Sequence, residues 1–171
     1  MTSVLIVIPA HNEELVIARN VRTLYGFCSR NLSSYDWKIL VASNGSTDAT
    51  VAQLSSELPK ISIVDFPEGG RGRTLRRVWG ESHADILVYM DAHLSTDLAA
   101  LPKLIEEIWR GADVAYGSRF ARGAQVERQF LREITSRGYR ALAQILLGLR
   151  ASDAACGFKA ICGSAFRKIA P

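Results

Sequence analysis

The chain has 171 residues, 48% of them hydrophobic and 22% charged, which suits one globular domain with a sizeable core and excludes disordered and fibrous classes. Its apolar stretches fall well short of the ~20 residues that a transmembrane helix requires. The formal net charge of +4 is uneven, because residues 1–100 hold 9 basic and 11 acidic side chains whereas residues 101–171 hold 12 and 6. The basic second half predicts an anionic partner, which is a phosphate, a nucleic acid or a membrane surface.

Short apolar runs alternate with longer amphipathic segments. In chain order the pattern predicts a strand at residues 4–8, a helix at 13–27, a strand at 37–42, a helix at 46–58, a strand at 61–66, a helix at 73–82, a strand at 86–90, a helix that ends near 109, a strand at 114–117 and a helix at 130–147. Pro9 is expected to stop the first strand, and Asn12, Ser46 and either Ser95 or Thr96 to cap helices. This alternation predicts a three-layer α/β/α fold whose mainly parallel sheet is covered on both faces, in a single domain.

Polar segments at residues 9–14, 43–48 and 91–95 each follow a predicted strand. Ligands of such sheets bind beyond the carboxyl ends of the strands, so one crevice can gather all three segments. Asp91 and His93 are two residues apart, which points their side chains to the same side of an extended segment. A carboxylate and an imidazole can share a divalent cation, and the cation can bridge the phosphates of a nucleotide sugar. The alternative is a capping Asp91 beside a solvated histidine, and the triplet alone favours it.

Other segments can contact a nucleotide, and each has an ordinary structural alternative. Glu13 can accept hydrogen bonds from a base or ribose, or it can simply complement a helix dipole. Residues 43–48 form a natural anion or ribose site, or an ordinary turn. Residues 69–77 combine loop glycines with four arginines, which suits a diphosphate, a solvated helix face or a nucleic-acid patch. No interleaved aromatic platform accompanies these arginines, so we expect no nucleic-acid partner.

Six arginines crowd the region between residues 119 and 140. Arg132 and Ser136 are four residues apart on a predicted helix, so both can contact one phosphate, although an exposed basic helix is the default explanation. An apolar run at residues 141–147 permits peripheral membrane contact. The cysteines, which are Cys28, Cys156 and Cys162, are odd in number and lack zinc-ligand spacing, as expected for reduced thiols. With no signal peptide visible, we expect a cytoplasmic protein, free or attached to the cytoplasmic face of a membrane.

Taken in order, these motifs resemble those of family-two glycosyltransferases with the GT-A, Rossmann-like fold, especially the dolichol-phosphate mannose and glucose synthases. Residues 8–14 are similar to P-x-x-N-E-E, 43–48 to D-D-G-S-x-D, 70–76 to G-K-G-x-x-x-R, 91–95 to D-A-D-L-S, 117–119 to G-S-R, 132–138 to R-x-x-x-S-R-G and 153–159 to D-x-x-C-G-F-K. The resemblance covers nearly the whole chain, which is expected to end earlier than its relatives do. Ser43, Asn44 and His93 each stand where the family has a carboxylate.

The resemblance implies inverting transfer of a hexose from a GDP- or UDP-sugar to a polyprenyl or dolichyl phosphate, with Mg or Mn as cofactor. It implies nucleotide-sugar-binding roles for Pro9, Ala10, Glu13, Ser43, Asn44, Arg71, Arg76, Asp91 and Ala92. It implies a metal and diphosphate site at Asp91, His93 and Ser95, an acceptor-phosphate site at Arg119, Arg132 and Ser136, and catalytic roles for Asp91 and Asp153. Two alternatives stay open: a nucleotide-sugar-binding module without turnover, and a basic nucleic-acid-binding domain.

Overall fold

A six-stranded sheet organises the computed structural model, which describes residues 1–54, 60–117 and 156–170. The strands are β1 (Ser3–Ala10), β2 (Asp36–Asn44), β3 (Ile61–Phe66), β4 (Ile86–Met90), β5 (Val114–Tyr116) and β6 (Phe158–Cys162). The helices are α1 (Ile17–Asn31), α2 (Arg71–Gly80), the short 3-10 helix η1 (Leu98–Ala100), α3 (Leu101–Trp109) and α5 (Gly163–Ile169). The chain comprises two compact units, Met1–Ala115 with Gly157–Pro171 and Tyr116–Cys156, and only three residues of the second are described.

The strand order in the sheet is β3-β2-β1-β4-β6-β5. β1 runs parallel to both β2 and β4, and β2 runs parallel to β3, whereas β6 is antiparallel to β4. Ala10 at the end of β1 pairs with Ser43 near the end of β2, so the loops that follow these strands leave the same edge. Met90 pairs with Phe158, which brings the start of β6 to that edge as well.

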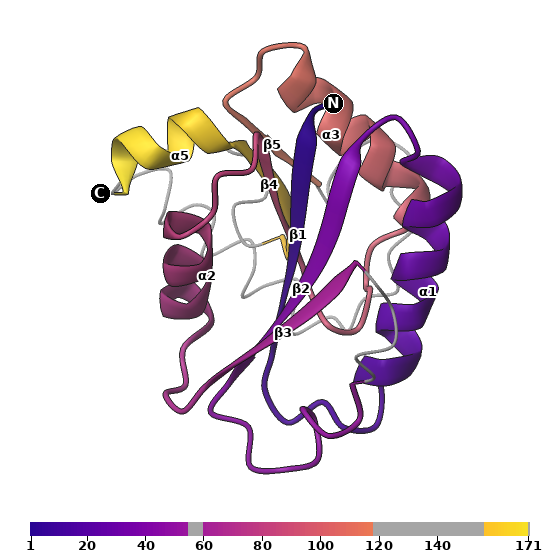
Figure 1. Ribbon diagram of the computed structural model, residues 1–171, viewed down its shortest axis with the longest axis vertical. Helices are drawn as coiled ribbons and strands as arrows, with labels where there is room; N and C mark the ends of the chain where they lie inside the picture. Colours follow the sequence, from indigo (N-terminus) through magenta and orange to yellow (C-terminus); the bar gives the residue numbers. More distant parts are fainter. Residues whose placement is uncertain (55–59, 118–155, 171) are drawn as a thin grey trace, which may run out of the picture. The chain divides into compact units, whose positions relative to one another are not determined.

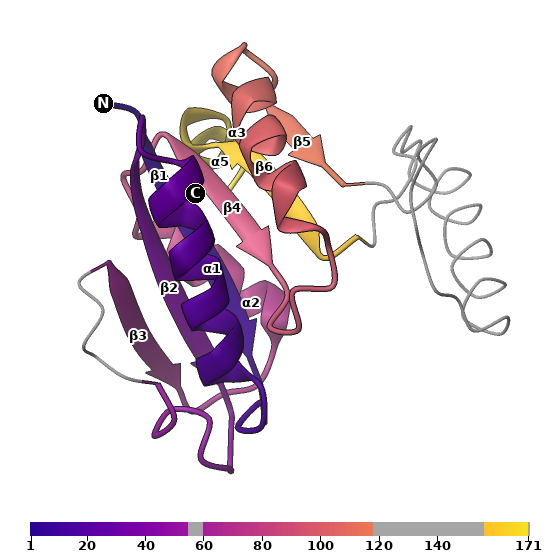
Figure 2. The same ribbon diagram turned by 90° about the vertical axis from the view of Figure 1, so that its right-hand side faces the viewer.

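Helices cover both faces of the sheet, with α1 and α3 on one side and α2 and α5 on the other (Figure 1). Figure 2, turned by 90°, shows α1 in front of the strands and α2 behind them. On the α2 and α5 side, Val7 packs with Val78, and Leu87 packs with Phe166. Alternation along β1 turns Ile6 to the opposite face, where it is fully buried. Burial on both faces explains why these strands are apolar runs rather than alternating patterns.

The predicted three-layer α/β architecture with a mainly parallel sheet is therefore confirmed, and so are all five predicted strands. β1, however, does not stop at Pro9 but runs on to Ala10. Its pairing with β4 ends at Val7 while its pairing with β2 continues through Pro9, so the missing N–H of the proline does not interrupt the strand. The sequence reading missed β6 and α5, and β6 is the antiparallel member of the sheet.

The prediction that Asn12 caps a helix beginning at residue 13 is wrong. α1 begins at Ile17, and Asn12 adopts a left-handed backbone conformation with φ of 55°. Its side chain accepts a hydrogen bond from the main chain of Thr47, at 2.8 Å, instead of capping its own helix. Asparagine tolerates this conformation better than most residues, which lets the loop after β1 turn toward the loop after β2.

Two further helix starts differ from the prediction. Residues 46–54 form turns rather than the helix expected to open at Ser46, because Thr50 and its neighbours bond to side chains instead of continuing a helical ladder. Neither Ser95 nor Thr96 caps the helix before residue 109. Asp97 instead caps η1, the short helix directly before α3, by accepting from the main chain of Ala99, and α3 itself has no side-chain cap. The helix predicted at 130–147 lies outside the described residues.

Cys28 and Cys162 are free thiols, as predicted. Burial in the core raises the pKa of Cys28 to about 12, partly offset by a backbone hydrogen bond, so this thiol is a packing group. Within the described parts of the chain, no helix combines the length and apolar character needed to cross a membrane.

Candidate functional site

The loops that follow β1 and β2 are joined by direct hydrogen bonds. The bonds run from Asn12 N to Ser46 Oγ (3.2 Å), from Thr47 N to Asn12 Oδ1 (2.8 Å), from Glu13 N to Thr50 Oγ1 (2.7 Å), from Glu14 N to Asp48 Oδ2 (3.1 Å) and from Ala49 N to Glu14 Oε2 (2.8 Å). Ser43 Oγ also donates to Ser46 Oγ. The two predicted nucleotide-contacting segments therefore form one connected surface at the carboxyl edge of the sheet.

Asn44 connects this surface to the glycine-rich loop before α2. Its side chain is buried, and its amide nitrogen donates to the carbonyl of Ala10 at 2.8 Å. Its amide oxygen accepts from Gly70 N at 3.3 Å, and its main-chain carbonyl lies 2.9 Å from Nδ1 of His11. A carboxylate could not donate to Ala10, so the asparagine at this family carboxylate position is explained by its need to donate and accept at once.

Gly45 allows the loop after β2 to approach the glycine-rich loop before α2 closely. Its φ is +69°, and a Cβ added there would lie 3.0 Å from the main-chain nitrogen of Gly69. Gly45 N also donates to the carbonyl of Phe66 at 2.8 Å, at the end of β3. The glycine-rich loop that leads into α2 is thus held against the ends of β2 and β3 through main-chain contacts.

Arg71 and Arg76, both exposed, lie five residues apart on α2, which sets them about 140° apart around the helix axis. Arg71 is the first residue of α2, next to the Gly70 amide that Asn44 holds. The neighbouring Arg73 pairs with Glu68 at 2.6 Å. Of the two predicted arginines, Arg71 is the one that lies next to the connected loops, because it directly follows Gly70.

Asp91 organises the turn that follows β4. Its Oδ1 accepts from His93 N at 3.0 Å, from Ser95 N at 3.2 Å and from Ser95 Oγ at 2.9 Å. Leu94 has a φ of 51°, which closes the turn. Ala92 is buried, and its carbonyl accepts from the side-chain amide of Asn20 at 2.8 Å. The structure thus brings together Asp91 and Ser95 of the predicted metal site, and it ties the turn to α1 through Asn20.

His93 points from this turn to the loop after β1. Its Nε2 lies 3.3 Å from Oε1 of Glu13, with 61% of the histidine side chain exposed and 19% of the glutamate. β1 and β4 are adjacent parallel strands, so this contact bridges two neighbouring loops. The structure therefore joins a predicted metal ligand to a predicted nucleoside contact.

Gly157 makes room beside the second oxygen of Asp91. A Cβ added to Gly157 would lie 3.2 Å from Oδ2 of Asp91 and 3.6 Å from the hydroxyl of Tyr89. A side chain here would crowd the carboxylate. Gly157 lies in the motif at residues 153–159 but had no predicted role, and Asn20 and Thr50, whose contacts are long-range, lie in none of the motifs.

The surroundings of Asp91 fit a divalent cation that takes most of its ligands from a bound diphosphate. Mg²⁺ is commonly held by one or two carboxylates together with substrate phosphates, rather than by a cage of protein ligands. Within residues 1–54, 60–117 and 156–170, no three His, Cys, Asp or Glu side chains converge into such a cage. The space that Gly157 leaves at Oδ2 suits this open type of site.

Arg119, Arg132, Ser136 and Asp153 lie outside the described residues, so the acceptor-phosphate site and the second catalytic carboxylate stay predictions. Pro9, Ala10, Ser43 and Asn44 are all buried at the carboxyl ends of β1 and β2, whereas Glu13 and His93 retain exposed atoms.

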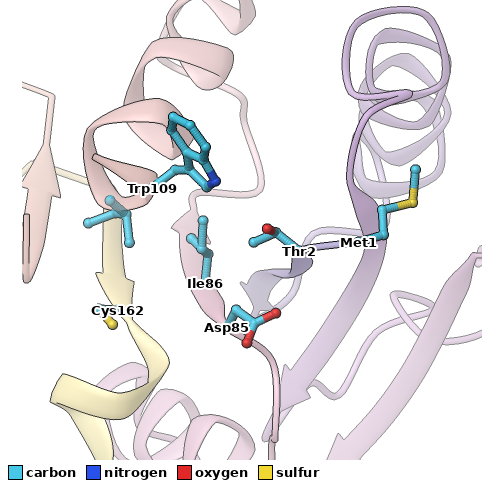
Figure 3. A pocket seen from close by; sticks show the side chains of 7 residues that line it. Met1, Thr2, Asp85, Ile86, Trp109 and Cys162 are labelled. Carbon is cyan, nitrogen blue, oxygen red and sulfur yellow. The ribbon is translucent and has the colours of Figure 1, made fainter. Parts of the chain in front are cut away.

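A cavity of about 410 Å³ lies at the opposite edge of the sheet (Figure 3). Figure 3 shows Asp85 and Ile86, at the start of β4, between Thr2 of the amino terminus and Cys162 at the end of β6. Exposed Trp109 completes the apolar part of the wall. Because ligands of parallel sheets bind at the carboxyl ends of strands, this cavity is not the candidate site.

Comparison with known proteins identifies the family to which this fold belongs. The chain matches the model of glycosyl transferase family 2 over residues 5–170, and it belongs to that family. It is 32% identical over 169 residues to the glycosyltransferase AglD of Haloferax volcanii, covering 96% of this chain and 27% of that protein. It is 33% identical over 146 residues to the dolichol-phosphate mannosyltransferase of Pyrococcus furiosus, covering 83% of this chain and 40% of that protein.

Solved structures support the same fold. Glucosyl-3-phosphoglycerate synthase from Mycobacterium tuberculosis, in complex with UDP, superposes with a TM-score of 0.66 at 21% identity, covering 95% of this chain and 57% of that one. The predicted GT-A fold is thereby confirmed. The chain spans less than two thirds of the length of these relatives.

Proposed function

We propose that this chain is the donor-binding part of a glycosyltransferase that moves a hexose from a GDP- or UDP-sugar to a polyprenyl or dolichyl phosphate. The observation that carries the proposal is the set of loops after β1, β2 and β4, which contact one another at the carboxyl edge of a family-two fold. The names of relatives add to it, since they include a dolichol-phosphate mannosyltransferase and a dolichyl-phosphate beta-glucosyltransferase.

In this proposal the nucleoside lies against the connected loops. Glu13 offers its partly exposed carboxylate to the base or ribose, and Pro9, Ala10, Ser43 and Asn44 form the buried floor beneath it. Arg71 and Arg76, both exposed on α2, supply positive charge for the diphosphate, and the turn of Asp91 and Ala92 contacts it as well. Donor recognition then depends on side chains from three strand ends.

The reaction is an in-line displacement with inversion. An oxygen of the acceptor phosphate attacks the anomeric carbon and forms the new carbon–oxygen bond. The bond from that carbon to the nucleotide diphosphate breaks, and its electron pair stays on the departing diphosphate. A phosphate acceptor is already anionic, so no strong general base is required. Arg119, Arg132 and Ser136 would hold the acceptor phosphate, and Asp153 would lie at the sugar, as the family resemblance implies.

Asp91, with His93 and Ser95, would hold Mg or Mn at the diphosphate. A bound divalent cation there neutralises charge on the leaving group. Imidazole favours softer metals than magnesium, so we expect Mn to be preferred. The M. tuberculosis synthase was crystallised with Mn2+ and UDP-glucose, which supports a divalent metal in this fold. A lipid-linked acceptor would bring the protein to the cytoplasmic face of a membrane, in peripheral contact with it.

Transfer of labelled sugar from GDP- and UDP-sugars to a polyprenyl phosphate in detergent tests the proposal. Asp91→Asn keeps an acceptor oxygen for the turn but removes the charge, so turnover should fall about 100-fold or more while the fold is kept. Asp97→Asn is the matched control, since asparagine also caps η1. Unchanged metal-dependent turnover in Asp91→Asn would rule out the assigned metal site.

A nucleotide-sugar-binding module without turnover is the second candidate. The structural use of Asn44 at a family carboxylate position favours it. It predicts saturable nucleotide binding with no transfer under any metal. The transfer assay therefore separates the two functions.

A further inference from the structure

The contact between His93 and Glu13 has a geometry that a metal-binding role alone does not explain. Nε2 of His93 lies 3.3 Å from Oε1 of Glu13. A proton on Nε2, which the cation and one neutral tautomer both carry, makes this contact attractive. The family's carboxylate at position 93 would instead place two like charges together. The substitution of histidine thus changes how position 93 relates to Glu13.

His93 leaves a turn that is held on two sides. Its own amide donates to Asp91 Oδ1 at 3.0 Å, and Leu94 N donates to Asp91 O at 3.2 Å. The preceding residue, Ala92, accepts from the buried side chain of Asn20 on α1 at 2.8 Å. The main chain that carries the imidazole is therefore fixed by contacts with β4 and α1 that do not require a ligand.

Glu13 is anchored through its main chain in the same way. Its amide donates to Thr50 Oγ1 at 2.7 Å, and its carbonyl accepts from Val16 N at 3.0 Å and Ile17 N at 2.9 Å, at the start of α1. Its side chain is only 19% exposed. A mostly covered carboxylate gains from a polar neighbour, and His93 is such a neighbour.

We propose that His93 is a positioning residue for Glu13, holding its carboxylate in place for the nucleoside part of the donor. Through this contact the turn at the diphosphate end of the crevice orders the loop at the nucleoside end. The inference rests on the proposed function, because it presumes that Glu13 contacts a nucleotide. It differs from a metal-ligand role in one respect: it acts on nucleotide affinity even where no metal takes part.

The experiment measures the affinity of the wild-type chain and its variants for UMP and GMP in EDTA, by calorimetry. His93→Ala should lower the affinity for the nucleotide that the wild type binds by about fivefold, as expected for a partly exposed ion pair. His93→Gln, which places an amide nitrogen near the position of Nε2, should recover most of that loss. His93→Asp should lower the nucleotide affinity at least as much as His93→Ala does. His83→Ala, at an exposed histidine before β4, is the matched control and should bind like the wild type.

Where the wild type binds nucleotide only with metal, the same variants are compared by titrating Mn²⁺ against binding of the nucleoside diphosphate. Loss of a metal ligand raises the Mn²⁺ concentration for half-maximal binding, whereas loss of a positioning residue lowers the limiting affinity for the nucleotide at saturating Mn²⁺, and we expect His93→Ala to show this second effect. Equal affinity of His93→Ala and wild type in EDTA, or a loss confined to the Mn²⁺ requirement, would overturn the inference. Failure of the wild type to bind any nucleotide or nucleotide sugar would instead overturn the proposed function.

Discussion

Replacing Asn44 by aspartate restores a carboxylate found in the family motif, yet the structure predicts that the protein becomes less stable. The substitution keeps an oxygen for Gly70 N but removes the amide that donates to Ala10 at 2.8 Å and to Ala42 at 3.4 Å. Asn44 is 5% exposed, so the new carboxylate faces carbonyl oxygens with little water. An unsatisfied buried acceptor costs about 1–3 kcal/mol, to which the penalty for a buried charge is added.

We therefore expect Asn44→Asp to lose about 3 kcal/mol at neutral pH, equivalent to a fall in Tm of roughly 6–12 °C for a chain of this size. Burial and the facing carbonyls raise the pKa of the introduced carboxyl in the folded state. A group with a raised folded-state pKa stabilises below its unfolded-state pKa and loses that contribution as pH rises through the folded-state value. The deficit of the variant should thus shrink in acid.

Thermal unfolding in EDTA, followed by tryptophan fluorescence at neutral and acid pH, measures both effects. Asn31→Asp is the matched control, because the exposed Asn31 also donates from its amide to a main-chain carbonyl, that of Phe27, at 2.8 Å. Asn31→Asp should lower the free energy of unfolding by less than about 1 kcal/mol. Wild-type stability of Asn44→Asp at neutral pH, or a deficit that does not shrink in acid, would refute the assigned hydrogen bonds.

Two further predictions concern the crevice and the opposite edge of the sheet. Gly157→Ala should lower transfer activity about tenfold, because the new methyl group would lie 3.2 Å from Oδ2 of Asp91 and crowd the carboxylate. Gly72→Ala is the control: no atom lies within 4 Å of the added carbon, so the substitution should leave activity unchanged and slightly stabilise α2. Equal activity of the two variants would contradict this. Hydrogen bonds from the amide and hydroxyl of Ser3 lower the pKa of Asp85, so its stabilising contribution exists above the ordinary pKa of aspartate and disappears as pH falls through the folded-state value. Asp85→Asn should therefore unfold at a lower temperature than wild type at neutral pH but not in acid, and a difference that persists in acid would disprove the contribution.

Five of the six strands in the sheet were predictable because each is a short, apolar, β-rich run. The helix starts were not, because the polar residues near them bond across the fold instead of capping locally. Asn12 and Thr47 are 35 positions apart in the sequence, as are Ala49 and Glu14. Rules for helix caps consider only neighbouring residues, so Asn12 and Ser46 were assigned to the wrong partners. β6 was missed because its five residues begin inside the motif at residues 153–159, so that no separate apolar run marked a strand.

The residues of the candidate site were predictable in part. Asp91, His93 and Glu13 follow strands at the edge where such sheets bind ligands, and the structure brings them to neighbouring loops. Their mutual contacts were not predictable, since the pairing of His93 with Glu13 depends on the adjacency of β1 and β4. Asn44 illustrates the same limit, because its role as a donor and acceptor between loops cannot be read from the motif it departs from.

Calorimetric titration of the chain with UDP, GDP and their sugars, in the presence of Mn²⁺ or Mg²⁺, tests the central claim most directly. The account predicts saturable binding of one nucleotide class at a single site, tighter with its sugar diphosphate and metal, and weakened in Asp91→Asn. Absence of binding to all of these ligands with either metal, in a folded chain, would contradict the claim that this crevice accepts a nucleotide sugar.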